Sequence, residues 1–250
     1  MATCSVIIIT LNEETRIGRC LASVDWADQV VVVDAGSSDG TVALCTAAGA
    51  QVHHRDWPGF GPQKNRALDL ATGDWVLSLD ADEYLSPGLA EEVRRRIDDP
   101  GRWGGFRLPR LSTFCGRPMR HSGWWPDEVL RLFRRGTARF TDELVHEKVI
   151  TAVPVTTLRG ILHHESVRTM EDAKAKVDRY SSAGALALHA KGRRASPASA
   201  VARGGWTFFR TWVLQAGFLD GRMGFRLAVA NAQGSYYRHA KLAMMRSRDR

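Results

Sequence analysis

The feature that most constrains the fold is a repeated order of strand and helix over residues 5–85. Short runs rich in Val and Ile predict strands buried on both faces, and they alternate with segments whose apolar residues recur at helical spacing. This order predicts an α/β fold with a mostly parallel, Rossmann-like central sheet. The expected strands are 5–10, 29–33, 50–54 and 75–79, and the expected helices are 13–24, 41–48 and 63–71.

Polar residues gather where three of these strands end. The clusters are Asn12-Glu13, residues 34–39 and residues 80–83. In open parallel sheets, ligands bind outside the carboxyl ends of the strands. We therefore expect the three clusters to contribute to one binding site.

Asp80 and Asp82 follow the fourth strand, with Ala81 between them and Glu83 behind. Strand geometry predicts that the two side chains point the same way, and adjacent carboxylates repel unless a cation or a proton lies between them. Mg²⁺ and Mn²⁺ prefer oxygen ligands and often share them with substrate phosphates. The pair predicts a metal that clamps a diphosphate; a solvated acidic turn is the alternative.

Asp34 ends the second strand ahead of a turn rich in Gly and Ser. A carboxylate there can accept hydrogen bonds from a base or a ribose, and glycine allows close backbone approach to a ligand. Turn formation alone would also explain these residues. The sequence has neither GxGxxG nor GxxxxGK[ST], which disfavours a dinucleotide site and a P-loop.

Positive charge is concentrated at the end of the chain. The 250 residues carry a net charge of +8, and residues 191–250 contain twelve Lys or Arg against two Asp. We expect an α/β domain over residues 1–190 and a basic, aromatic helical arm over residues 191–250.

On a helical wheel the arm has one broad apolar face, with Arg and Tyr residues following it. This face predicts contact with an anionic membrane interface, and packing against the chain's own core is the alternative. No nucleic-acid-binding module is recognisable, so we expect no nucleic acid partner. The face consists of Trp206, Phe208, Phe209, Trp212, Val213, Ala216 and Leu219.

Targeting signals are not recognisable. The N-terminus shows no signal-peptide pattern, and no apolar run approaches the roughly 18 residues of a membrane span. The four cysteines form no CxxC pair, so neither disulfides nor a zinc site are expected. These features predict a cytoplasmic location, peripheral on the inner face of the cytoplasmic membrane.

Four motifs in this order resemble the family 2 glycosyltransferases of GT-A fold: VIIITLNEE at 6–14, VVVDAGSSDGT at 31–41, QKNRAL at 63–68 and GDWVLSLDADE at 73–83. Later segments resemble the branch that glucosylates the bacterial lipopolysaccharide inner core. They are VLRLFR at 129–134, LVHE at 144–147, His163-His164 and GFLDGR at 217–222. The resemblance covers nearly the whole chain and is more specific at the front.

The resemblance implies an inverting, metal-dependent transferase that uses a nucleotide-diphosphate sugar, with UDP-glucose the expected donor. It makes residues 1–190 the catalytic domain, and it implies Mg²⁺ or Mn²⁺ as the metal. Asp82 would be the direct metal ligand, with Asp80 as its DxD partner and His164 (or adjacent His163) completing the site. The other implied donor-binding residues are Thr10, Asn12, Glu13 and Ala81 around the nucleotide, Asp34 at the base or ribose, and Lys64 and Arg66 near the diphosphate.

The catalytic base is the least defined part of the site. Inversion requires a carboxylate opposite the leaving diphosphate, to deprotonate the acceptor hydroxyl as it attacks. The acidic motif of the family matches best at His146-Glu147, which makes Glu147 the first candidate. Asp142 and Glu143 remain alternatives.

The expected acceptor is a lipopolysaccharide inner-core heptose or a similar lipid-linked saccharide. A polyprenyl phosphate or another cell-envelope glycan is the second hypothesis for the acceptor. A catalytically silent nucleotide-binding module that recruits partners to a membrane is a third possibility, which retention of Asp80, Asp82 and a candidate base disfavours.

Overall fold

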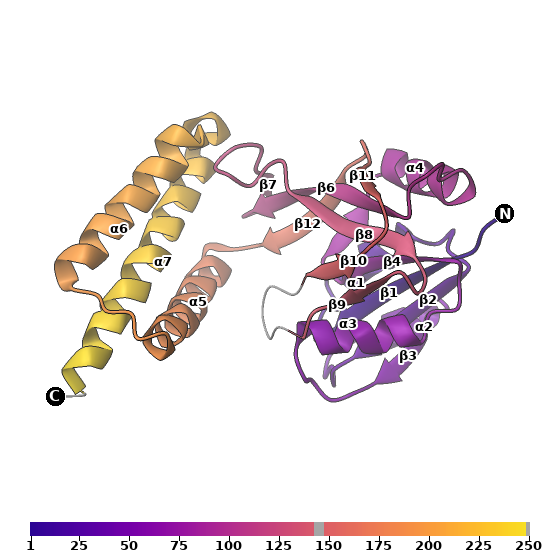
Figure 1. Ribbon diagram of the computed structural model, residues 1–250, viewed down its shortest axis with the longest axis horizontal. Coiled ribbons are helices and arrows are strands. Elements are labelled where there is room, and N and C mark those ends of the chain that lie inside the picture. Colours follow the sequence, from indigo (N-terminus) through magenta and orange to yellow (C-terminus); the bar gives the residue numbers. More distant parts are fainter. Residues whose placement is uncertain (143–147, 249–250) are drawn as a thin grey trace. The chain divides into compact units, whose positions relative to one another are not determined.

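The computed structural model describes residues 1–142 and 148–248 of the chain (Figure 1). Its internal contacts define two compact units, Met1–Arg110 with Asp127–His164 and Leu111–Pro126 with Glu165–Arg250. The sequence predicted a boundary between residues 190 and 191. Part of the difference is helix α5 (Met170–Ala190), which packs against α7 (Gly221–Arg248) within the second unit, and part is the segment Leu111–Pro126.

The first unit begins with the predicted alternation of strands and helices. Helix α1 starts later than expected, because Asn12 has a left-handed φ of 56° and the chain turns before it becomes helical. The elements are β1 (Cys4–Thr10), α1 (Ile17–Ala22), β2 (Gln29–Asp34), α2 (Thr41–Ala47), β3 (Gln51–His54), α3 (Phe60–Asp69), β4 (Trp75–Asp80), β5 (Glu83–Leu85) and α4 (Pro87–Asp98).

The parallel half of the sheet has the strand order β3-β2-β1-β4. Every residue of β1 is buried, and its side chains alternate between two cores. Val6 and Ile8 pack into one core, whereas Ile7 and Ile9 pack into the other. Burial on both faces explains why this strand reads as a continuous apolar run.

The rest of the first unit is mixed in strand direction. Strand β8 runs antiparallel to β4 and to β6, β11 runs parallel to β6, and β5 pairs with β12. The predicted α/β class, with a Rossmann-like, mainly parallel central sheet and a helical C-terminal arm, is confirmed. These later strands are β6 (Gly105–Phe114), β8 (Glu128–Arg134), β9 (Ala138–Phe140), β10 (Val149–Thr151), β11 (Val155–Thr157) and β12 (Leu162–Val167).

The second unit is mostly helical. Helix α6 (Pro197–Phe209) begins where Ser196 caps it and Pro197 takes its first position. Helix α7 packs against both α5 and α6 (Figure 1). The short strand β7 (Arg117–Pro118) pairs with the end of β6.

The predicted apolar face requires one continuous helix over residues 206–219, and the structure divides this segment into three elements. The helix passes through a π-helical turn, η1 (Arg210–Leu214), and the chain reverses at Ala216, whose φ is 51°. A separate 3₁₀ turn, η2 (Gly217–Asp220), follows. Within residues 1–142 and 148–248, no helix is both long and apolar enough to cross a membrane.

Helix α3 lies unusually close to the chain that leaves β9. A Cβ atom on Gly61 would lie 1.7 Å from the carbonyl oxygen of Thr141. The Asn65 side chain donates to the carbonyl of Phe140 at 2.9 Å and accepts from its amide at 3.0 Å. Helix α3 therefore fixes where the chain stands just ahead of the candidate base residues.

We expect Gly61→Ala to lower the free energy of unfolding by about 1–3 kcal/mol, because the added methyl overpacks a backbone contact. Gly18→Ala is the matched control, since a Cβ on that helical glycine would meet nothing within 4 Å. Urea unfolding of both variants measures the difference. Equal stabilities would show that α3 does not need this close approach.

Candidate functional site

The three polar clusters meet at one edge of the parallel sheet. The register places Thr10 beside Asp34, and Ile9 beside Asp80. The loop after β1 also bonds the loop after β2, since the Asn12 amide donates to Ser37 Oγ and the Ser38 amide donates to Asn12 Oδ1, each at 2.8 Å. The three clusters therefore lie close together, as expected, and their contribution to one binding site stays a prediction.

Asp34 is fully buried and shapes its own loop. Its carboxylate accepts the amides of Gly36 and Ser37, each at 2.9 Å, and lies 3.2 Å from His54 Nδ1. Burial alone would raise the pKa of Asp34, but the hydrogen bonds from Ser37 and Gly36 outweigh it and hold the pKa below its usual range. The predicted contact with a base or ribose remains a prediction, and the observed role is to organise the turn.

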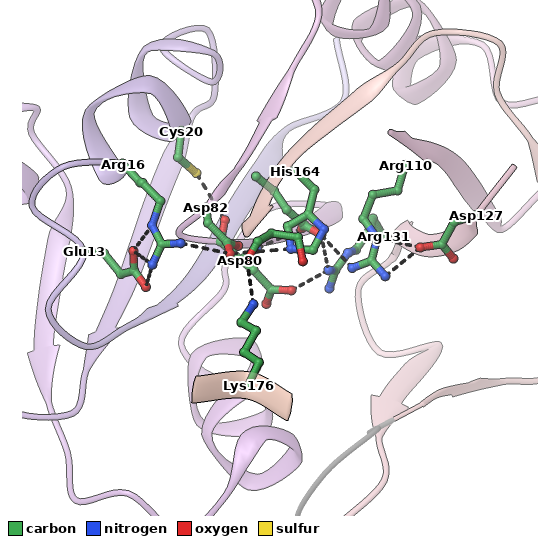
Figure 2. A network of polar contacts seen from close by, with 12 residues as sticks. Glu13, Arg16, Cys20, Asp80, Asp82, Arg110, Asp127, Arg131, His164 and Lys176 are labelled. Atoms are coloured by element: carbon green, nitrogen blue, oxygen red, sulfur yellow. Dashed lines mark hydrogen bonds and ion pairs between the residues drawn. The ribbon is translucent and has the colours of Figure 1, made fainter. Parts of the chain in front are cut away.

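Asp80 lies between two buried cations. Its Oδ1 is 2.8 Å from Lys64 Nζ. Its Oδ2 is 2.6 Å from Arg131 Nη2 (Figure 2). Only 2% of Lys64 and 6% of Arg131 are exposed, so solvent screens these ion pairs weakly. Burial would raise the pKa of Asp80, but the charges of Arg131 and Lys64 overcome it and keep the pKa far below its ordinary value.

Glu83 extends this network and fixes the turn after β4. The side chain is completely buried and accepts the Asp80 amide at 3.0 Å. It also binds Arg131 at 2.6 Å and Arg110 at 3.0 Å. Arg110 in turn pairs with Asp127 at 2.7 Å (Figure 2). Asp80 and Glu83 of the predicted acidic cluster are therefore paired with buried and half-buried Lys and Arg side chains.

Asp82 lies beyond the last strand residue and faces different partners from Asp80. Strand β4 ends at Asp80, so the alternation of a strand does not set the direction of Asp82. The Oδ2 atom of Asp82 is 3.5 Å from His164 Nε2 and 3.5 Å from Arg16 Nη1. Burial would raise the pKa of Asp82, but His164 and Arg16 outweigh burial and the Asp80 charge, and hold the pKa below its usual range.

Asp82 and His164 have the donor chemistry and spacing of two neighbouring ligands on one ion. Donors at about 2.1 Å from an octahedral Mg²⁺ lie about 3 Å apart, near the 3.5 Å observed here. In the described part of the chain, no three His, Cys, Asp or Glu side chains gather into a metal-binding group. The residues therefore fit an ion that takes few protein ligands and completes its shell with phosphate and water.

The remaining predicted donor-binding residues occupy varied positions. Arg66 contacts Asp56 and Gln63 rather than Asp80. Thr10 and Ala81 are buried near the strand ends, and Thr10 Oγ1 has no hydrogen-bond partner. Glu13 pairs with Arg16 and donates its amide to Thr41 Oγ1 at 2.8 Å.

The structure describes His163 and Asp142 among the alternative candidates for the metal ligand and the base. His163, the substitute for His164, stacks on Tyr84 with ring centroids 4.8 Å apart. Asp142 is exposed just after Thr141. Glu143 and Glu147 lie outside the described residues, so their assignment as candidate bases stays a prediction.

The sequence reasoning assigned no role to Arg131, Arg110 or Arg16. Arg131 could have been found, because it is a charged residue inside the apolar strand pattern of residues 129–133. A charge at such a position must be paired when it is buried, which marks it as the partner of an acidic site. No comparable local signal distinguishes Arg110 or Arg16.

Residues 5–151 match the family model described as glycosyl transferase family 2. The uncharacterized glycosyltransferase RT0209 of Rickettsia typhi is 30% identical over 97% of this chain and 87% of that protein. The lipopolysaccharide core biosynthesis glycosyltransferase LpsC of Rhizobium meliloti is also 30% identical, over 94% and 93% respectively. Among solved structures, glucosyl-3-phosphoglycerate synthase of Mycobacterium tuberculosis with Mn²⁺ and UDP is 26% identical over 46% of this chain and 45% of that chain, with a TM-score of 0.37.

We expect Arg131→Met to lower the free energy of unfolding by about 3–5 kcal/mol, because it leaves buried Glu83 and Asp80 short of a counter-charge. Arg139→Met is the control, since the Arg139–Asp69 pair is more than half exposed and such pairs contribute less than about 1 kcal/mol. Denaturant unfolding near neutral pH compares them. Similar stabilities for the two variants would mean that the Arg131 network does not support the site.

Proposed function

Because the chain belongs to glycosyl transferase family 2, we propose that it transfers glucose from UDP-glucose to a lipopolysaccharide inner-core or similar lipid-linked acceptor, with inversion at the anomeric carbon. One observation carries the proposal: cations and candidate metal ligands share a sheet edge, where Lys64 and Arg131 flank Asp80, and His164 faces Asp82. A diphosphate needs both kinds of group, because its charge must be neutralised as it leaves. The relative LpsC, named for lipopolysaccharide core biosynthesis, supports the acceptor class.

The chain's own residues would bind and orient the donor. Asn12 and Glu13 follow β1 and would line the nucleotide pocket, while Lys64 would stand near the diphosphate. Asp82 and His164 would hold Mg²⁺ or Mn²⁺, which would neutralise charge on the leaving nucleotide. The ion pairs of Asp80 would hold Lys64 and Arg131 in place before the donor binds, which is the preorganisation that electrostatic catalysis requires.

A carboxylate must take the proton of the acceptor hydroxyl as that oxygen attacks the anomeric carbon. We assign this role to Glu147, with Asp142 and Glu143 as alternatives. Support comes from the anchoring of Phe140 by Asn65, one helical position beyond Lys64. That anchor brings the chain toward the cation site shortly before residue 142.

The helical arm supports a location at the inner face of the cytoplasmic membrane. Large apolar side chains there remain in water, among them Trp206 (57% exposed), Leu214 (59%) and Leu219 (61%). A lipid-linked acceptor would be reached from such a surface. A polyprenyl phosphate acceptor would fit the same surface. An assay of glucose transfer to each of the two acceptor lipids distinguishes the two hypotheses.

We expect Asp82→Ala to remove the divalent-dependent part of UDP binding, because it deletes the ligand that faces His164. In calorimetry, the gain in UDP affinity on adding Mn²⁺ should fall by more than about tenfold. Asp25→Ala, at an exposed position of the same unit, should bind like the unmodified chain. Unchanged Mn²⁺-dependent affinity in Asp82→Ala would remove this residue from the metal site.

We expect Glu147→Gln to bind UDP-glucose normally but to transfer glucose at least about 10²-fold more slowly, the scale of a lost general base. Single-turnover transfer and donor binding measured side by side separate the two effects. Asp142→Asn and Glu143→Gln are the comparison variants. If either of them, rather than Glu147→Gln, shows the selective loss, the base is that residue.

A further inference from the structure

The second unit contains an open pocket of ≈ 420 Å³ lined by Trp212, Gly221, Arg222, Phe225 and Arg226. Its volume lies in the range of sites that hold small molecules or head groups. The residues come from η1 and from the first two turns of α7. None of them belongs to the predicted donor site.

The two aromatic residues that line this pocket, Trp212 and Phe225, belong to a larger group of contacting aromatic rings. Trp212 makes edge-on contacts with Phe225 and with Phe218, at centroid distances of 5.4 and 6.4 Å. Phe208 contacts Phe225 in the same way at 5.7 Å. Phe218 and Phe225 nevertheless remain 51% and 46% exposed.

The pocket also carries two arginines that form no ion pair in the described part of the chain. Arg222 and Arg226 are exposed, and across residues 1–142 and 148–248 no carboxylate forms an ion pair with either one. Lys241 on the same helix, in contrast, pairs with Asp178 at 2.6 Å. The pocket is therefore suited to an anion.

The acidic residue nearest to Arg222 in sequence is Asp220, and its hydrogen-bond partners lie elsewhere. Asp220 accepts the amides of Arg120 and His121, each at 3.1 Å, and the Ser122 hydroxyl at 3.0 Å. Its carboxylate is therefore used in anchoring the loop of residues 120–122 and does not neutralise Arg222. Within the GFLDGR segment, Asp220 therefore makes hydrogen bonds inside the second unit, whereas exposed Arg222 can contact a ligand.

Close backbone packing builds the pocket into the fold. A Cβ atom on Gly224 would lie 2.0 Å from the carbonyl oxygen of Gly217. Only glycine therefore allows η2 to lie against the start of α7. This contact holds the aromatic residues of η1 and η2 beside the arginines of α7.

The apolar residues around the pocket favour a membrane lipid over a soluble phosphate as the source of the anion. Leu219 and Leu214 are 61% and 59% exposed, and Phe218, which belongs to the group of contacting aromatic rings, is 51% exposed. A phosphate free in water gains nothing from apolar neighbours, whereas a membrane lipid offers an apolar layer beneath its charged head group. We propose that this pocket binds the phosphate-bearing head group of an anionic phospholipid in a membrane surface.

The proposal rests on the proposed function, since it names the membrane component that would hold the enzyme near a lipid-linked acceptor. Arg222 and Arg226 donate to the phosphate oxygens, because a guanidinium fork suits a phosphate. Phe218 and Leu219 enter the interface, and the aromatic rings lie at the level of the head groups.

The test is sedimentation of the full chain with phosphatidylcholine vesicles, with and without phosphatidylglycerol. The Arg222→Gln/Arg226→Gln variant should lose affinity for the anionic vesicles by at least about tenfold. Arg193→Gln/Arg194→Gln is the matched control, since it removes the same charge from two exposed residues between α5 and α6. The control should lose much less.

Two further arms complete the experiment. Leu219→Gln should weaken vesicle binding while leaving both arginines in place, and soluble glycerol phosphate should not compete. Equal losses in the two double variants, or full competition by glycerol phosphate, would overturn the proposal. Mn²⁺-dependent UDP binding, measured on the same samples, should be unchanged in the arginine variants. Its absence from the unmodified chain would instead count against the proposed function, and vesicle binding would still be decided separately.

Discussion

The pairing of half-buried Asp80 and fully buried Glu83 with cations is the interaction on which the candidate site depends. Lys64 comes from α3, Arg131 from β8 and Arg110 from β6, so one charge network joins three elements to the end of β4 and the start of β5. Each charge would be costly to bury alone, and the partners together make burial tolerable. The network therefore acts as a single unit that defines the edge of the sheet.

The two neighbouring carboxylates of this site have different partners. Asp80 is held by Lys64 and Arg131, while Asp82 faces His164 and Arg16. One carboxylate thus serves to hold cations at the sheet edge, and the other has a nitrogen donor opposite it. Positive groups beside candidate metal ligands suit a diphosphate with a divalent ion, which is why the proposed chemistry follows from the charges rather than from the fold alone.

The helical unit is organised by different forces. Helix α7 packs against α5 and α6, and an internal carboxylate at Asp220 anchors the loop that carries His121. Large apolar side chains stay exposed there, which a chain acting only in water would gain by burying. Contact with lipid would stabilise a surface of this composition, and under our proposal the pocket at Arg222 and Arg226 would give that contact a preference for anionic head groups.

The sequence by itself determined the order of strands and helices, the family, and the gathering of polar residues at strand ends. These are local properties, because strand and helix periodicities and turn residues are readable within a few positions. Only the tertiary structure decided that Arg131 pairs with Asp80 and Glu83, which lie 51 and 48 residues away. It also ended the predicted amphipathic helix at a left-handed Ala216, because the packing of η2 on α7 outweighs the helical pattern there. Partners distant in sequence and reversals of the chain are set by packing, which no local pattern encodes.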